Sequence, residues 1–277
     1  MLKLMYITNN PEVAIIAENA GVDRIFIDME YIGKNARQGG MDTVQNHHTV
    51  EDVKNIKKVL SKADLLVRVN PIHEPTYDYC SSEEEIDAVI EAGADIVMLP
   101  FFKTVDEVKR FIDYVSGRAK TMLLLETAEA VEVVNEIIKE PGIDEIHIGL
   151  NDLSLSYGKK FMFELLADGT VERLCLLFKQ NGLTYGFGGV AAIGTGMLSA
   201  EAILKEHYRL GSSMVILSRA FCDVNKNKDL RYIKEKFSIG VRSMRSFEKE
   251  IAIHSRYFKE NEAEISSCVS KIVEILN

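Results

Sequence analysis

Residues 95–115 read DIVMLPFFKTVDEVKRFIDYV and contain a predicted strand followed by a predicted helix. Asp95–Pro100 is a short, nearly all-apolar run, which is typical of a parallel strand buried on both faces. Val105–Val115 carries its apolar residues at helical spacing. A strand and a helix in this order form one unit of an α/β fold, so the number of such units decides the architecture.

Apolar runs of the same kind recur along the chain, with amphipathic stretches between them. The eight runs are Leu2–Thr8, Arg24–Met29, Leu65–Asn70, Asp95–Pro100, Thr121–Glu126, Glu145–Leu150, Thr184–Gly188 and Ser213–Arg219. A helix is expected over Ala128–Lys139, ended by Pro141 and Gly142, and Thr49 has the position of a helix cap. Eight alternating units predict an α/β protein with a (β/α)8 TIM barrel. An open doubly wound sheet is the alternative, but the first connection lacks GxGxxG.

The barrel is expected to occupy residues 1–225, followed by a C-terminal helical extension over residues 226–277. Three helix-like stretches, Leu230–Phe237, Gly240–Lys259 and Ala263–Leu276, make up this extension. They are expected to pack on the barrel or on a neighbouring subunit.

Charge and composition exclude several classes of protein. The formal net charge of −9 argues against nucleic-acid binding, which needs a basic face. The four cysteines are scattered without metal-ligand spacing. No apolar run approaches the roughly 20 residues that cross a bilayer, and the N-terminal run is too short for a signal peptide. The sequence therefore indicates a cytoplasmic protein without membrane or nucleic-acid partners.

Charged residues lie at or near the predicted carboxyl ends of the second and third strands. Asp28 and Glu30 are two residues apart and so share one side of the strand. Arg68 lies inside the apolar run LLVRVNP, where a guanidinium is costly to bury without a partner. It is expected to hold a substrate carboxylate in a bidentate fork. The alternative is a structural salt bridge with one of the strand-two acids.

The fifth and sixth strands each deliver one carboxylate to the mouth of the barrel. Glu126 ends TMLLLE and Asp152 follows HIGLN. Two carboxylates with several waters are the usual protein contribution to a Mg²⁺ or Mn²⁺ site. Neither strand carries a lysine for Schiff-base chemistry, and Lys103 is expected to bind a substrate anion or to face solvent. This pattern favours a metal ion that polarises a carbonyl and stabilises an enolate.

At these residues the sequence resembles the HpcH/HpaI aldolase and citrate lyase β-subunit family. The matching motifs, in the family's order, are IDMEY, LLVRVNP, EEIDAVIEAGADIVMLP, LLLETAEAV and IHIGLNDLSLSYG. The resemblance implies a (β/α)8 barrel, a divalent ion on Glu126 and Asp152, and substrate oxygen on Arg68. It implies that backbone N–H groups of Leu150, Asn151 and Asp152 hold the carboxylate of a 2-oxo acid. It also implies a homo-oligomer, a trimer or hexamer, with a helix exchanged between subunits.

Several positions depart from the family's pattern. Tyr31 stands where aldolases of the family carry a catalytic histidine, although Glu91 occupies the place of the acid that partners it. His47 and His48 lie in the insertion ARQGGMDTVQNHHTVEDV. Either could replace the missing base, because the unperturbed pKa of histidine is near neutral, or both could be exposed loop residues.

Three further positively charged or titratable residues have open interpretations. Arg37, in the same insertion, could bind a phosphate or a second carboxylate, or face water. His147 sits inside the sixth strand and reads as a packed, structurally satisfied histidine. Arg219 ends the eighth strand and could reach substrate or form a salt bridge.

These residues support a metal-dependent carbon–carbon lyase of the class II aldolase type, acting through a pyruvate-like enolate of a 2-oxo acid. Three alternatives remain open. The first is a citrate-lyase-like enzyme acting on an acyl thioester, and the second is a phosphoenolpyruvate-handling enzyme. The third is a barrel that binds without catalysis, which the loss of the histidine at Tyr31 would favour and which Arg68, Glu126 and Asp152 oppose.

Overall fold

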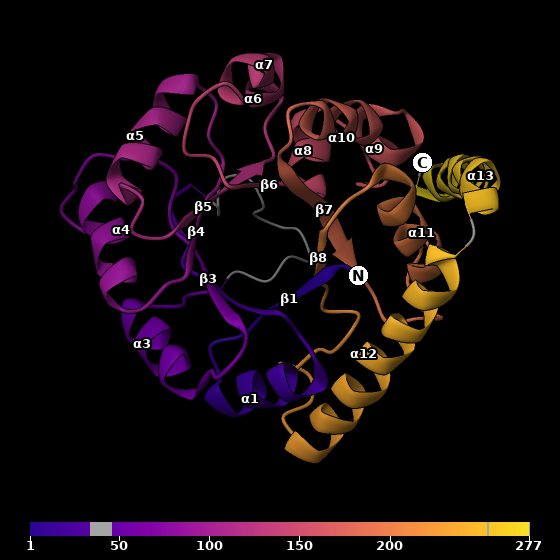
Figure 1. The fold of residues 1–277 in the computed structure, drawn as a ribbon, viewed down its shortest axis with the longest axis horizontal. Coiled ribbons are helices and arrows are strands. Elements are labelled where there is room, and N and C mark those ends of the chain that lie inside the picture. Colours follow the sequence, from indigo (N-terminus) through magenta and orange to yellow (C-terminus); the bar gives the residue numbers. More distant parts are fainter. Residues whose placement is uncertain (34–45, 254, 277) are drawn as a thin grey trace.

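The computed structural model describes residues 1–33, 46–253 and 255–276. Eight parallel strands form a closed barrel in sequence order, and helices surround it (Figure 1). The strands are β1 Lys3–Ile7, β2 Arg24–Asp28, β3 Asp64–Arg68, β4 Ile96–Leu99, β5 Lys120–Leu125, β6 Glu145–Ile148, β7 Thr184–Val190 and β8 Met214–Leu217. The barrel closes where Tyr6 of β1 pairs with Leu217 of β8. The predicted TIM barrel is confirmed.

Most helices begin at a polar cap. The helices are α1 Pro11–Ala20, α3 Val50–Val59, α4 Ser82–Glu91, α5 Val105–Val115, α6 Ala128–Glu132, α7 Val134–Ile137, α8 Leu150–Ser156, α9 Glu164–Ala167, α10 Thr170–Gln180, α11 Ala200–Leu210, α12 Leu230–Ala252, the 3-10 turn η1 Ser255–Tyr257 and α13 Phe258–Leu276. Thr49, Ser81 and Thr104 each form a capping box with an acidic residue three positions later. Such reciprocal bonds satisfy backbone N–H groups that a helix start leaves unpaired.

Two apolar layers hold the barrel together. The outer layer lies between strands and helices, and the inner layer fills the barrel axis. The inner layer consists of Met5, Phe26, Leu66, Ile96, Met98, Met122, Leu124 and Met214. Strand residues are therefore buried on both faces, which explains their nearly all-apolar composition.

The C-terminal helices differ from the expected division into three. Leu230–Phe237 and the first part of Gly240–Lys259 form one continuous helix, α12, because Gly240 lies inside it. A Cβ at Gly240 would come within 2.7 Å of the Phe221 ring, so the glycine allows that ring to pack there. The expected break at Gly240 is therefore wrong: close packing, not helix termination, explains this glycine.

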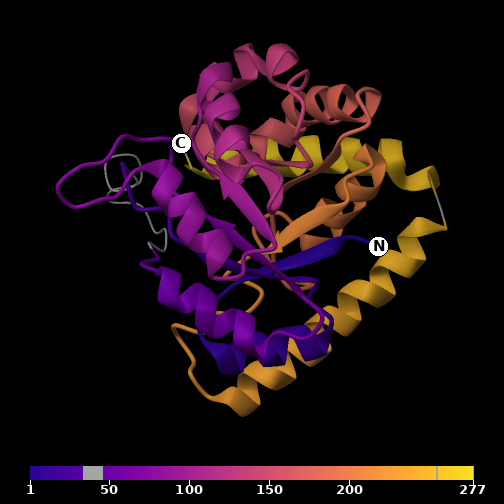
Figure 2. The same ribbon diagram turned by 60° about the vertical axis from the view of Figure 1, so that its left-hand side comes forward.

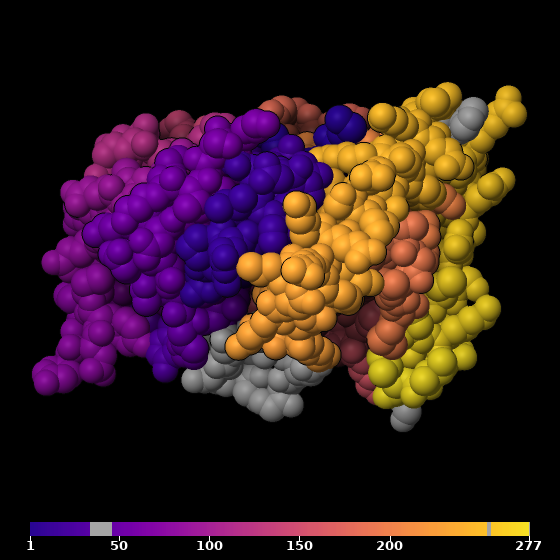
Figure 3. Space-filling view, turned by 90° about the horizontal axis from the view of Figure 1, so that it is seen from below, coloured from indigo at the N-terminus to yellow at the C-terminus, as the bar shows by residue number. Residues whose placement is uncertain are grey.

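The positions of α12 and α13 show what the extension covers. Helix α12 packs against α1 and α11, as the barrel's eighth helix does, and Figure 3 shows it running across the surface beside α1. Helix α13 folds back onto α9 and α11 (Figure 2). The buried Asn261 of α13 donates hydrogen bonds to the Ala202 carbonyl and to Glu206, both on α11, and so holds the two helices together. Within the described ranges, no helix is long and apolar enough to cross a membrane.

Candidate active site at the mouth of the barrel

A cavity of about 590 Å³ opens at the carboxyl ends of the strands. This is the end where the loops of TIM-barrel enzymes carry their catalytic groups. The lining includes the charged residues Asp28, Arg68, Glu126 and Asp152. It also includes apolar side chains, among them Leu150, Phe161, Met162, Phe163, Met197 and Leu198. The cavity therefore suits a ligand with an anionic, oxygen-rich end and a less polar remainder.

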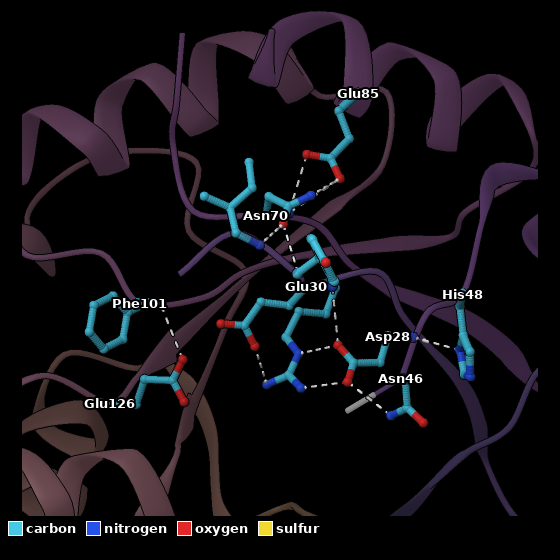
Figure 4. A network of polar contacts seen from close by, with 11 residues as sticks. Asp28, Glu30, Asn46, His48, Asn70, Glu85, Phe101 and Glu126 are labelled. Atoms are coloured by element: carbon cyan, nitrogen blue, oxygen red, sulfur yellow. Dashed lines mark hydrogen bonds and ion pairs between the residues drawn. The ribbon is translucent and has the colours of Figure 1, made fainter. Parts of the chain in front are cut away.

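Arg68 is held by the two acids of strand two. Its Nε and Nη2 donate to the two carboxylate oxygens of Asp28, each at 2.8 Å. Its Nη1 lies 3.3 Å from Glu30 Oε2. Figure 4 shows these carboxylates around the guanidinium. The salt bridge that the sequence left open is thus present, and the bidentate fork engages Asp28 rather than standing free for a substrate.

The electrostatic surroundings keep Arg68 charged. Burial by itself lowers the pKa of the guanidinium, but Asp28, Glu30 and Glu126 together raise it above its ordinary value. The guanidinium also lies over the Phe26 ring, with its carbon 5.6 Å from the centroid. Arg68 lines the cavity, so its charge is available to an anionic ligand while its orientation is set by the protein.

Two residues that the sequence analysis did not single out support the loop after β2. Asn70 Oδ1 accepts hydrogen bonds from the backbone N–H groups of Tyr31 and Ile32, both at 2.8 Å. Asn70 Nδ2 donates to Glu85 at 2.8 Å. Burial raises the pKa of Glu85 above its ordinary value, although the hydrogen bonds from Asn70 oppose this shift. In the sequence, this supporting role was indicated by the position of Asn70 at the end of the apolar run of strand three.

The expectation for Glu91 needs correction. Glu91 is the last residue of α4 and is exposed. Barrel helices run antiparallel to their strands, so the end of α4 lies away from the mouth. The acid of this helix that reaches the strand-two loop is Glu85, in its first turn. Within one chain, Glu91 is not brought to the candidate site.

Glu126 and Asp152 both reach the cavity, as expected from the strand ends. Glu126 is 3% exposed and Asp152 is 7% exposed. Glu126 accepts a hydrogen bond from the Phe101 backbone at 3.1 Å, and Phe101 has a φ of 48°. A Cβ at Gly149 would lie 2.7 Å from Glu126 Oε2. The glycine before α8 therefore leaves the room that the Glu126 carboxylate occupies.

The residues of the first turn of α8 differ in exposure. Leu150 is buried and Asn151 is exposed. All three residues of that turn, Leu150, Asn151 and Asp152, line the cavity. The first N–H groups of a helix have no acceptor within it. Their role in holding a substrate carboxylate stays a prediction.

The insertion after strand two returns to the site. His48 Nδ1 accepts a hydrogen bond from the Asp28 backbone at 3.0 Å. Asn46 donates to Asp28 Oδ2 at 3.0 Å and lines the cavity. His47 is exposed, and its ring lies 5.0 Å from that of Tyr31. His48 is thus in contact with the backbone of Asp28, and none of His47, His48 and Tyr31 is part of the cavity lining. Arg37 lies outside the described residues.

Other expected side chains have simpler surroundings. Lys103 is exposed and forms an ion pair with Glu129 at 2.7 Å. Arg219 is exposed and lines the cavity. His147 is buried on β6, as the interpretation as a packed histidine expected, and it also lines the cavity. In the part of the chain that the structure describes, no group of three or more histidine, cysteine, aspartate or glutamate side chains is placed to hold a metal ion.

Comparisons with known proteins agree with this architecture. The family model of HpcH/HpaI aldolase/citrate lyase matches residues 3–165. A (3S)-malyl-CoA thioesterase of Cereibacter sphaeroides is 24% identical over 183 residues, which span 65% of this chain and 60% of that protein. The matched part is therefore less than two thirds of the relative's length.

Two solved structures share the fold at low sequence identity. The HpcH/HpaI aldolase from Desulfitobacterium hafniense DCB-2 has a TM-score of 0.60 and 16% identity, over 84% of this chain and 93% of the other. A HpcH/HpaI aldolase/citrate lyase family protein from Burkholderia cenocepacia J2315 has a TM-score of 0.61 and 17% identity, over 84% and 94%.

Proposed function

Because the chain belongs to the HpcH/HpaI aldolase/citrate lyase family, we propose that it is a divalent-metal-dependent carbon–carbon lyase acting through the enolate of a 2-oxo acid. The observation that carries the proposal is the convergence of Glu126 and Asp152 on the cavity that Arg68 also lines. A non-catalytic binding barrel would not need two buried carboxylates and a buried arginine at the same mouth.

The donor set fits a hard divalent cation. Arg68 already has Asp28 and Glu30 as partners, so Glu126 and Asp152 add two further carboxylates to the same buried region. Carboxylate oxygens are the donors that Mg²⁺ and Mn²⁺ prefer, with waters completing the coordination. When bound, the ion would polarise the substrate carbonyl and lower the energy of the enolate. Glu126 and Asp152 would hold it.

The remaining residues bind and orient the substrate. Arg68 faces the cavity with its direction fixed by Asp28, so it would attract the oxygens on which negative charge develops. Asp28 is in turn positioned by Asn46 and by His48. The side chain of Glu30 is buried and pairs with Arg68, so Glu30 would contribute to catalysis by positioning that arginine. His48, which contacts Asp28, is a better proton-transfer candidate than the exposed His47.

An acyl-thioester substrate is the second candidate. It is favoured by the similarity to a (3S)-malyl-CoA thioesterase and by apolar residues of the cavity lining, such as Phe161, Phe163 and Met197, which could contact a less polar group. Citrate-lyase-like cleavage and thioester hydrolysis are both compatible with these features. Oligomerisation to a trimer or hexamer stays a prediction, which light scattering on the purified protein would test.

The decisive experiment follows exchange of pyruvate methyl protons with D₂O by NMR, with and without Mg²⁺ or Mn²⁺. We expect metal-dependent exchange in the wild type and a loss of about 10²-fold or more in Glu126→Gln, because the variant removes a charged oxygen donor. Glu129→Gln is the matched control, since Glu129 is exposed and pairs with Lys103. It should exchange at the wild-type rate.

Two outcomes would redirect the proposal. Exchange that persists in Glu126→Gln, with Mn²⁺ binding unchanged by calorimetry, would contradict the assignment of the metal site. No exchange with any metal, together with metal-dependent cleavage or hydrolysis of malyl-CoA, would favour the thioester reaction instead.

A further inference from the structure

His147 is a polar side chain on the floor of the cavity. It lies on β6, two residues after Glu145 and two residues before Gly149, which follows the strand. Because side chains alternate along a strand, these three positions face the barrel interior. Glu145 bonds to Arg24 inside the barrel, and Gly149 adjoins Glu126 at the mouth. His147 itself is 1% exposed and lines the cavity. It therefore lies deeper than the carboxylates of the candidate metal site.

The hydrogen bonding of His147 defines which tautomer is present. Nε2 lies 3.0 Å from the carbonyl oxygen of Gly188. A carbonyl only accepts, so Nε2 must carry the proton. Burial lowers the pKa of His147 to about 4; the bond to Gly188 opposes the shift, and Arg24 and Arg68 reinforce it. The ring is therefore neutral near pH 7, and Nδ1 carries a lone pair.

Within the described ranges, that lone pair accepts no hydrogen bond. Nδ1 has no hydrogen-bond partner among the described residues, although the ring is buried. The neighbouring floor of the cavity is apolar and consists of Ile7, Phe26, Leu124 and Ile216. A buried acceptor that stays unsatisfied destabilises a complex by its desolvation. A ligand that supplies a donor at this depth would remove that penalty.

We propose that Nδ1 of His147 accepts a hydrogen bond from the substrate, so that the site selects 2-oxo acids carrying a hydroxyl or another donor group at the end that enters the barrel. The inference rests on the proposed function and names its substrate class. A site with a buried acceptor discriminates against a ligand that places an alkyl group there, because the acceptor loses water without gaining a partner.

Matched ligand pairs test this selection. Hydroxypyruvate and 2-oxobutyrate differ by a hydroxyl in place of a methyl group. 5-Hydroxy-2-oxopentanoate and 2-oxohexanoate extend the comparison by two carbons and carry no β-hydroxy group that the proposed lyase could cleave. Each is measured as a competitor of pyruvate proton exchange in the metal-loaded protein. We expect the hydroxyl member of at least one pair to bind about tenfold more tightly in the wild type.

Three variants identify the atom responsible. His147→Phe removes the acceptor and should abolish the preference for the hydroxyl member. His147→Asn can place its amide oxygen near the position of Nδ1 and should restore part of it. Glu129→Gln is again the control, because Glu129 is exposed, pairs with Lys103 and does not line the cavity. It should keep the wild-type ratio.

A second measurement separates failure of this inference from failure of the proposed function. In ¹⁵N-labelled, metal-loaded protein, the Nδ1 resonance of His147 should move on addition of a hydroxyl ligand and stay in place with its alkyl counterpart. Such a shift without any pyruvate exchange would support the inference while contradicting the lyase. Equal affinities in all pairs, or an Nδ1 resonance that no ligand moves, would overturn it and indicate that an ordered water occupies the floor.

Discussion

Among the described residues, two buried arginine–carboxylate forks lie between the strands of the barrel, one near each end, and they differ in what surrounds them. Arg24 at the start of β2 donates to both oxygens of Glu145, at 2.6 and 2.7 Å, and its side chain is fully buried. Arg68 at the end of β3 pairs with Asp28 in the same bidentate manner but is 13% exposed and lines the cavity.

The difference shows how one kind of interaction serves two purposes. At the amino ends of the strands the pair is closed off, with Met214 against the guanidinium. It can contribute only to stability and to the specificity of the fold. At the carboxyl ends the pair faces a cavity with two further carboxylates, so its charge can act on a ligand. Substitutions at the two arginines should therefore separate stability from activity.

The largest effect on stability is expected for Arg24→Met. The variant leaves Glu145 buried without its cation, and such changes cost about 3–5 kcal/mol. Urea denaturation followed by circular dichroism measures the change in the free energy of unfolding. The double variant Arg24→Met, Glu145→Met replaces the whole pair by apolar side chains and should recover most of the loss. A double variant as unstable as the single one would show that the pair is not the cause.

A smaller loss of stability and a larger loss of activity are expected for Arg68→Met. Asp28 and Glu30 lose their shared partner, but the adjoining cavity admits water, so we expect about 1–2 kcal/mol. Metal-dependent pyruvate exchange should fall about 10²-fold, because the guanidinium no longer stabilises charge on the substrate. If Arg68→Met proves as destabilising as Arg24→Met, with folded protein still active, the two forks have the same structural role.

The smallest effect concerns pH and the histidine that lies between the two forks. His147 has a pKa of about 4 in the folded protein against 6.5 ordinarily. Between these values the unfolded chain binds a proton that the folded protein does not, so the unfolding free energy falls as the pH falls. From pH 7 to 5.5 this amounts to about 1 kcal/mol. His147→Phe should reduce this dependence and leave the part due to His207, whose pKa burial also lowers. An unchanged slope would show that His147 is protonated in the fold.

Much of the candidate site could be predicted because strand ends are visible in the sequence. Asp28, Arg68, Glu126 and Asp152 each follow or end an apolar run, and a closed barrel brings all such positions to one mouth. Glu91 was misplaced because a resemblance to a family's sequence pattern does not show which end of a helix faces the mouth. Asn70 and Glu85 were missed since their importance lies in hydrogen bonds between elements 15 residues apart.

The sequence by itself determined the class of fold and the positions of the charged residues along the strands. Periodicity and strand order suffice for this, because each strand–helix unit is a local pattern that repeats. Only the tertiary structure decided which charges meet. It paired Arg24 with Glu145, 121 residues away, and Arg68 with Asp28. It also left Nδ1 of His147 without a partner among the residues that the structure describes. Closure of the barrel sets these distances, and no local pattern in the chain encodes them.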